Sequence, residues 1–470
     1  MADPFDETIW PMPELGHELE ALCIASPRAA GHGERALEWA CEQLVAGRNP
    51  GELCEAALWV GLRNSRSEGR GPGALLGHAV LAAPACRSLG ASDPTGATSA
   101  MAAAQLCGYV AGTYHGGVND PAEGPTRLAW FDPMDLGADP VAAFSELATR
   151  GEPDLADQAW LAAAHADPVA AEQALISLGA GGYELNEHKL IYPAQLRAWI
   201  GDEAPVDPLL FRVAARYVGN HLQARRAAES RRADAAALAE MVDAGISDGD
   251  HDLERVSVVA TGIARTPRSE LGALLIGSLQ DELDPQDLVL AVALVNAARY
   301  SDSDFGTDPL GVVSPIHACT GTNALRRCLV RARSDELRFE LALCATESSS
   351  ARHLAPIAEL AVPVFDDGAL DDLHEALDEG DPDAAAEAAS AIPPEDGDAV
   401  ATAWTAIAAA AAGDQWMVMH AAKQVVAMRE DFHSSAHPAK AWFLAAAART
   451  AAHVSAAEQP FARRARDLLS

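Results

Sequence analysis

The chain has 470 residues, of which 49% are hydrophobic and 5% aromatic, and its formal net charge at pH 7 is −34. This acidity argues against nucleic-acid binding, because a phosphate backbone would be repelled and no basic stripe offsets the repulsion. No apolar run reaches membrane length, and the acidic start has no signal-peptide core. The eight cysteines include no C-x-x-C pair, so we expect reduced thiols and a cytoplasmic protein without a membrane segment.

Asp-Pro and Glu-Pro pairs recur along the chain and predict where helices begin. In chain order they stand at 139, 152, 167, 207, 284 and 381. The acidic residue is a good N-cap, and proline suits the first helical position because its missing N–H needs no partner there. Apolar residues follow at spacings of three and four, as in LADQAWLAAAHA (155–166), and we find no convincing alternating strand. The sequence therefore predicts an all-α fold.

Two pairs of similar segments indicate an internal repeat. Residues 42–65 resemble 280–301, and residues 143–160 resemble 373–390. Units one and three therefore match, as do units two and four, which predicts a four-fold helical repeat of about 115 residues per unit. We expect two pseudo-symmetric halves, 1–230 and 231–470, that pack as one globular unit.

Each expected unit has a histidine where a glycine-rich or polar loop leads into a helix. These junction histidines are His78, His188, His317 and, in the fourth unit, His433 and His437. An arginine stands nine residues after each of the first three, at Arg87, Arg197 and Arg326. The fourth unit, taken from His437, lacks this arginine.

The junction position favours a metal-binding imidazole. A helix N-terminus carries partial positive charge and opposes protonation, and neutral imidazole is the form that binds metals or acts as a base. Because related units place equivalent positions around a common axis, we expect His188, His317 and His437 to meet in one cavity, with His78 or His433 completing the set. Imidazole ligands suit several transition metals. Iron is our first choice, with copper or haem as alternatives.

Several other residues leave the site open. Histidines at His115, His221 and His353 follow the junctions by 33 to 37 residues, and His420 stands on the helix before the last junction. Each is either a ligand or an ordinary hydrogen-bonding group. The catalytic candidates are Lys440, Lys189 and Tyr192. The lysines could orient an anion or an oxygen species, with a solvated surface lysine as the alternative.

Four junction stretches carry a family resemblance. They are IHACTGTNALRRCL (316–329), HPAKAWFLAAAA (437–448), EHKLIYPAQLRAW (187–199) and GHAVLAAPACRSL (77–89). These stretches resemble the questin oxidase-like family of helical, histidine-rich proteins, and similar segments occur behind Rieske domains in bacterial chains. The resemblance implies an oxygen-using oxidoreductase that opens polycyclic polyketides by Baeyer–Villiger-type chemistry. It also implies functional roles for His78, His188, His317 and His437, with Lys440 nearby.

The sequence thus favours a histidine-ligated, metal-dependent oxidoreductase that acts on a small organic molecule, perhaps one of natural-product metabolism. Motifs for phosphate loops, serine hydrolases and zinc proteases are absent. The alternatives are a haem-binding protein and a non-enzymatic helical scaffold that binds a partner on a concave face. Unit one has no polar residue after His78, which leaves substrate and reaction open.

Overall fold

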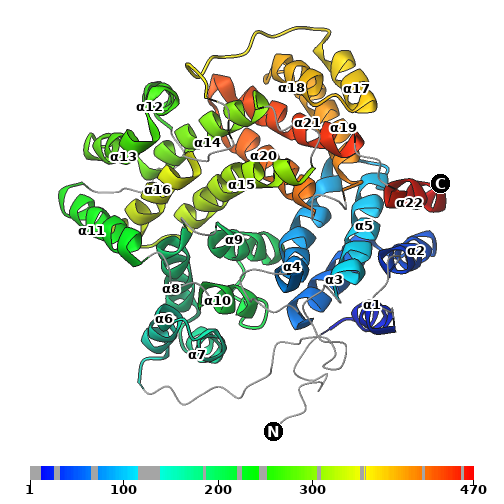
Figure 1. Ribbon diagram of the computed structural model, residues 1–470, viewed down its shortest axis with the longest axis horizontal. Coiled ribbons are helices and arrows are strands. Elements are labelled where there is room, and N and C mark those ends of the chain that lie inside the picture. Colours follow the sequence, from blue (N-terminus) through cyan, green and yellow to red (C-terminus); the bar gives the residue numbers. More distant parts are fainter. Residues whose placement is uncertain are drawn as a thin grey trace.

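The computed structural model describes most of the chain. The described residues are 12–25, 32–64, 72–114, 138–183, 187–219, 225–242, 251–303, 309–349, 354, 356–414, 419–456 and 460–470. All regular structure in these ranges is helical, which confirms the all-α prediction (Figure 1). None of the described helices is both long and apolar enough to cross a membrane.

The helices follow one another with short connections. In the first half of the chain they are α1 (Glu14–Ala25), α2 (His32–Val45), α3 (Pro50–Asn64), α4 (Pro72–Leu89), η1 (Gly90–Ser92), α5 (Ala97–Tyr114), α6 (Pro140–Arg150), α7 (Pro153–Ala166), α8 (Pro168–Gly181), α9 (His188–Ile200), α10 (Arg212–Gly219) and α11 (Arg225–Met241). In the second half they are α12 (Leu253–Arg265), η3 (Arg268–Glu270), α13 (Leu271–Gln280), α14 (Pro285–Ser301), α15 (Pro309–Arg331), α16 (Asp335–Ser349), α17 (Ala369–Glu379), α18 (Pro382–Ala391), α19 (Gly397–Ala411), α20 (His420–Ser434), η4 (Pro438–Lys440), α21 (Ala441–Ala456) and α22 (Pro460–Leu469).

The acidic residue before proline caps the helix as predicted at four of the six pairs. Side-chain oxygens accept backbone N–H groups of the first turn at Asp139, Asp167, Asp284 and Asp381. Glu152 precedes α7 without a side-chain cap. Asp207 accepts from Leu209 and Leu210, but it begins a turn, and α10 starts only at Arg212.

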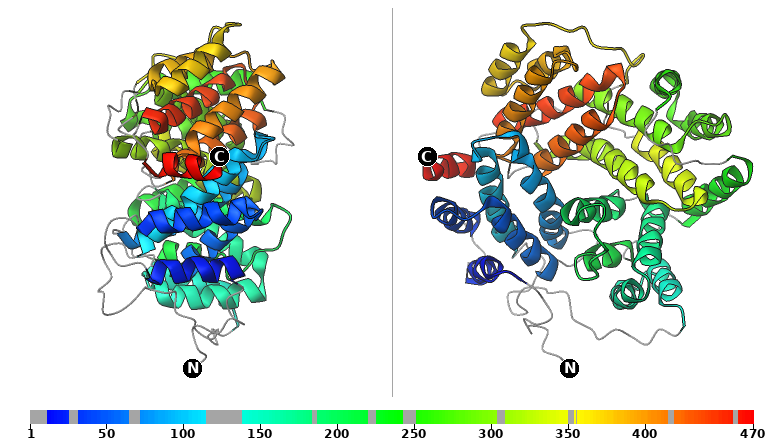
Figure 2. Two further views of the ribbon diagram at one scale, coloured as in Figure 1. Left: turned by 90° about the vertical axis from the view of Figure 1, so that its right-hand side faces the viewer. Right: turned by 180° about the vertical axis from the view of Figure 1, so that it is seen from behind.

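Four helices form the centre of the molecule. α4, α9, α15 and α20 pack in a closed ring, each against the next, and outer helices cover them (Figures 1 and 2). α3 and α5 lie on α4, α8 and α10 on α9, α14 and α16 on α15, and α19 and α21 on α20. α15 and α20 run parallel: His317 meets His420 near the start of α20, whereas Arg326, further along α15, donates to Ser434 at the end of α20.

The core between these layers is built largely from alanine and branched aliphatic residues. α14 and α21 are buried on nearly all sides, as expected for helices that are apolar all round. Small alanine side chains let the helices approach closely. The largest fully buried side chains are Trp160 and Trp404.

A buried ion pair joins α7 to α10. The Asp157 carboxylate accepts from Nε and Nη2 of Arg212 at 2.7 and 2.6 Å, and both side chains are fully buried. We expect Asp157→Ala to destabilise the protein by about 3–5 kcal/mol, because it leaves the guanidinium charge buried without its carboxylate.

Urea unfolding followed by circular dichroism measures this loss. The control is Glu146→Ala, which removes an exposed partner of Arg150 and should cost less than about 1 kcal/mol. Equal losses in the two variants would contradict the assignment of a buried charge pair.

Candidate metal centre

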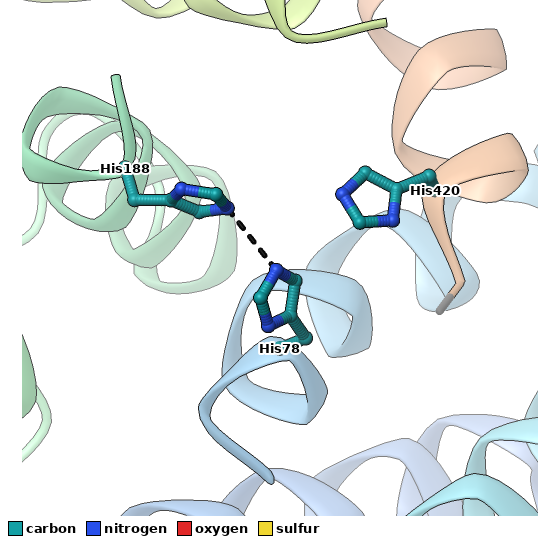
Figure 3. A group of neighbouring side chains, drawn as sticks. All are labelled: His78, His188 and His420. Carbon is teal, nitrogen blue, oxygen red and sulfur yellow. Dashed lines mark hydrogen bonds between the residues drawn. The ribbon is translucent and has the colours of Figure 1, made fainter. Parts of the chain in front are cut away.

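Four histidines, one from each helix of the central ring, lie side by side within the ring. His188 and His420 are the first residues of α9 and α20. His78 lies in the first half of α4, and His317 follows Pro315 within α15. Figure 3 shows the rings of His78, His188 and His420 pointing toward one another from three separate helices.

The rings are in close contact around the whole square. Nε2 of His188 lies 3.1 Å from Nε2 of His78, and Nε2 of His317 lies 3.0 Å from Nε2 of His420. The centroids of neighbouring rings are 4.5 to 5.3 Å apart. The candidate ligand atoms of His78, His188 and His420 all lie within 4.8 Å of one another. We call these four residues the histidine ring.

These separations suit a shared metal ion. Two nitrogens bound to one metal at roughly 2.0–2.1 Å lie about 2.9 Å apart at a right angle and about 3.4 Å apart at the tetrahedral angle. The two closest nitrogen pairs of the ring fall between these limits. The same distance also allows an N–H···N hydrogen bond between two neutral imidazoles, so the geometry admits both arrangements.

The environment keeps the imidazoles neutral. Burial lowers the pKa of His188 and His420 well below the usual value of 6.5, and it lowers the pKa of His317 to about 3. The neighbouring imidazoles add to the shifts of His188 and His420, and the buried Lys423 adds to all three. These nitrogens therefore offer lone pairs to a cation at neutral pH without first losing a proton.

An arginine stands nine residues after every member of the histidine ring. These arginines are Arg87, Arg197, Arg326 and Arg429. Arg429 donates to the carbonyls of Ser88 and Leu89 at the end of α4, at 2.6 and 3.3 Å. Arg87 in turn donates to the carbonyl of Trp199 at the end of α9, at 2.6 Å.

The remaining two arginines complete this set of contacts. Arg326 of α15 donates to Asp431 and Ser434 at the end of α20. Arg197 of α9 pairs with Glu172, which also accepts from Arg331 of α15 at 3.0 Å. The ends of all four central helices are thus tied together about 13 Å from the histidines, since nine helical residues rise about 1.5 Å each.

We expect Arg429→Met to destabilise the protein by about 1–3 kcal/mol, because the carbonyls that end α4 lose a charged donor inside the molecule. Urea unfolding measures the change. The control is Arg265→Met, since Arg265 pairs with Glu359 on the surface and should cost less than about 1 kcal/mol. A cost for Arg429→Met no larger than that of the control would contradict the tie between α20 and α4.

The structure brings together three of the five histidines expected to bind metal, namely His78, His188 and His317. His437 lies outside the histidine ring, because both of its nitrogens are engaged elsewhere. Its Nδ1 accepts the Ala439 N–H at 3.1 Å, and its Nε2 lies 2.8 Å from Ser257 Oγ. His433 packs against Phe432 and Trp404 in the last turn of α20.

The hydrogen bonds of His437 also fix its tautomer. Because Nδ1 accepts a backbone N–H, the ring proton sits on Nε2 and is donated to Ser257 Oγ. Ser257 itself donates to the carbonyl of Leu253 at 2.8 Å. His437 therefore caps η4 and is not placed to act as a base toward Ser257.

His420 is the fourth member of the ring, and its role was left open by the sequence. A signal was present in HAAKQVVAMR (420–429), which has the same histidine-to-arginine spacing as the other three helices. The histidines His115, His221 and His353 lie outside the described residues.

The three catalytic candidates lie in different places. Lys189 points away from the ring toward the end of α8, where a Cβ on Gly182 would come within 2.0 Å of its Nζ. Lys440 places its Nζ 4.6 Å from the centre of the Phe432 ring. Tyr192 stays near the centre: its ring lies 5.0 Å from that of Tyr217, which lies 6.2 Å from the His188 ring.

The lysine nearest to the ring in sequence is one that the sequence did not single out. Lys423 follows His420 by three residues on α20 and is 3% exposed. Burial lowers its pKa to about 7, while Asp414 opposes the shift. A group with this pKa can hold or release a proton near neutral pH.

No protein-family model matches this chain, and no curated protein or solved structure is significantly similar to it. The resemblance to the questin oxidase-like family therefore remains a hypothesis.

Proposed function

We propose that the protein is a metal-dependent oxidoreductase whose metal ion is held by His78, His188, His317 and His420. The observation that carries the proposal is the histidine ring itself. Four imidazoles come from four helices far apart in the sequence and present closely spaced nitrogens at a buried point. Packing alone does not require histidine at four such positions, and apolar residues would fill the space without unpaired polar atoms.

The ligand set favours a transition metal. Imidazole nitrogens suit iron, copper, zinc and nickel, whereas calcium and magnesium prefer oxygen ligands. Iron remains our first choice and copper the second, because both supply redox chemistry when bound. Haem fits less well, since ring centroids only 4.5 to 5.3 Å apart around the whole square leave no room for a macrocycle between opposite histidines.

The residues around the ring suit oxidation of a small organic molecule. The metal would exchange electrons with a substrate or with oxygen. Lys423 could supply or accept a proton near neutral pH. Burial raises the pKa of Tyr192 well above 10, so its phenol stays protonated and can donate a hydrogen bond. Oxygen-dependent ring opening, as in the questin oxidase-like family, belongs to this proposal as its most specific form.

We further infer that the ring arose from a four-fold internal repeat. Each unit would supply one central helix with a histidine and, nine residues later, an arginine. The histidines of the first pair are 110 residues apart and those of the second pair 103 residues apart. The proposed halves, 1–230 and 231–470, would each contribute two ligands. The proposal includes a cytoplasmic location, which the eight free, buried cysteines support.

Elemental analysis of the purified protein, together with its visible spectrum, tests the proposal. We expect about one transition-metal ion per chain after expression in metal-supplemented medium, and oxidation-state-dependent absorption if the ion is iron or copper. A helical scaffold that only binds a partner would contain no stoichiometric metal. Protein that stays metal-free after reconstitution with iron, copper and zinc would refute the metal centre.

A further inference from the structure

Gln424 is a buried side chain with unused hydrogen-bonding capacity. It lies on α20, one helical turn after His420, and is fully buried. Neither its Nε2 nor its Oε1 has a hydrogen-bond partner among the described residues. Most buried side-chain amides are hydrogen-bonded, so an amide with both atoms unpaired needs an explanation such as an ordered water or a ligand.

The amide lies close to the histidine ring. Residues four apart on a helix are neighbours on one face, with Cβ atoms roughly 5–6 Å apart. Long side chains in a helix also lean toward its N-terminus, and His420 is the first residue of α20. Gln424 therefore extends toward His420.

A contact with α15 fixes the position further. The Gln424 amide lies beside the thiol of Cys319, two residues after His317. Burial raises the pKa of this thiol to about 12, and the amide opposes the shift. The thiol therefore stays protonated and is only a weak hydrogen-bonding partner. This places the amide between α15 and α20, next to the pair formed by His317 and His420.

We propose that Gln424 forms a subsite for a small hydroxyl-bearing ligand beside the histidine ring. The ligand would accept from Nε2 and donate to Oε1, which a water molecule or an organic hydroxyl group can do and an aliphatic group cannot. Its oxygen would then lie within reach of a metal held by His317 and His420. This inference rests on the proposed function and names the ligand class that the metal centre takes.

The test uses the copper-loaded protein and azide, a small anion whose binding to copper gives a charge-transfer absorption band. Gln424→Met keeps the size of the side chain but removes the amide. We expect copper content equal to wild type and azide affinity about tenfold lower, the effect of one lost hydrogen bond to a charged ligand. The control is Gln158→Met, a buried glutamine on α7, which should bind azide as wild type does.

The outcomes separate the two proposals. Wild-type protein that takes up no copper overturns both. Copper uptake with unchanged azide affinity in Gln424→Met, or with an equal loss in Gln158→Met, overturns the subsite and leaves the metal centre standing. If Gln424→Met does not fold, Gln424→Asn, which retracts the amide by one methylene, serves in its place with the same expectation.

A second measurement identifies the occupant of the resting site. Electron–nuclear double resonance of the copper protein in heavy water detects exchangeable protons near the metal. Loss of one such coupling in Gln424→Met identifies solvent water as the resting ligand. Unchanged couplings with weaker azide binding indicate a subsite reserved for the hydroxyl group of an organic substrate.

Discussion

Replacing His420 by alanine is expected to remove most of the bound metal while leaving the helices intact. Four-ligand zinc sites bind their metal with about 10–16 kcal/mol, so one of four imidazoles accounts for about 3 kcal/mol, or a roughly 100-fold loss of affinity. The same loss is expected for alanine at each other ring position. Metal content by elemental analysis after gel filtration, with circular dichroism on the same sample, measures both parts of the expectation.

The matched control is His437→Asn. His437 is also buried and also follows a helix of the second half, but it caps η4 instead of entering the ring. Asparagine caps helices well, so the variant should fold and keep its metal. Loss of metal from His437→Asn with full retention in His420→Ala would reverse our assignment of the fourth ligand.

The metal-free protein is expected to lose stability as the pH falls below about 6.5. In the unfolded chain a histidine takes up a proton near this pH, whereas burial lowers the folded-state pKa of His188, His317 and His420. Below pH 6.5 the unfolded state therefore binds more protons, and the free energy of unfolding falls with pH. For His317, with a folded pKa of about 3, the loss reaches about 5 kcal/mol at most.

Urea unfolding of chelator-treated protein between pH 8 and pH 4.5 measures this dependence. The loss should begin near pH 6.5, and it should be smaller in His317→Gln, which keeps a polar side chain but does not titrate. Metal restores stability at neutral pH, since an ion that binds only the folded state stabilises it. A free energy of unfolding that stays flat from pH 7 to pH 5 would show that the imidazoles are not buried in their neutral form.

The helical fold could be predicted because its signals are local. Acidic caps before proline and the three- and four-residue apolar spacing determine helix starts and buried faces without knowledge of the tertiary structure. The pair at 207 shows the limit of this reasoning: Asp207 organises its turn as expected, but the chain continues to Arg212 before the helix begins.

The fourth ligand was harder to predict, because α20 begins without a local signal. Its N-cap position is Met419, which has a left-handed φ of 57° and makes no side-chain cap. The junction at Pro438 has the expected capping chemistry, and it drew attention to His437. The capping role of His437 is itself the reason for its position there, whereas His420 is placed by packing of α20 against α4 and α15.

Three of the four ring histidines could be found because spacing to a later arginine is visible in the sequence. Their convergence could not be derived from that spacing alone, since it depends on how arginines tie the distant helix ends together. Arg429 and Arg87 reach carbonyls of other helices, and such long-range partners leave no mark on the local pattern. The subsite at Gln424 was invisible for the same reason, because only packing shows that its amide lacks a partner.

X-ray absorption spectroscopy at the edge of the bound metal tests the central claim most directly. The account predicts a first shell dominated by four imidazole nitrogens at roughly 2.0–2.1 Å, with the multiple-scattering pattern of histidine, and one imidazole fewer in any His420→Ala protein that retains metal. A first shell made mainly of oxygen or sulfur, or an imidazole count that does not change in His420→Ala, would contradict it.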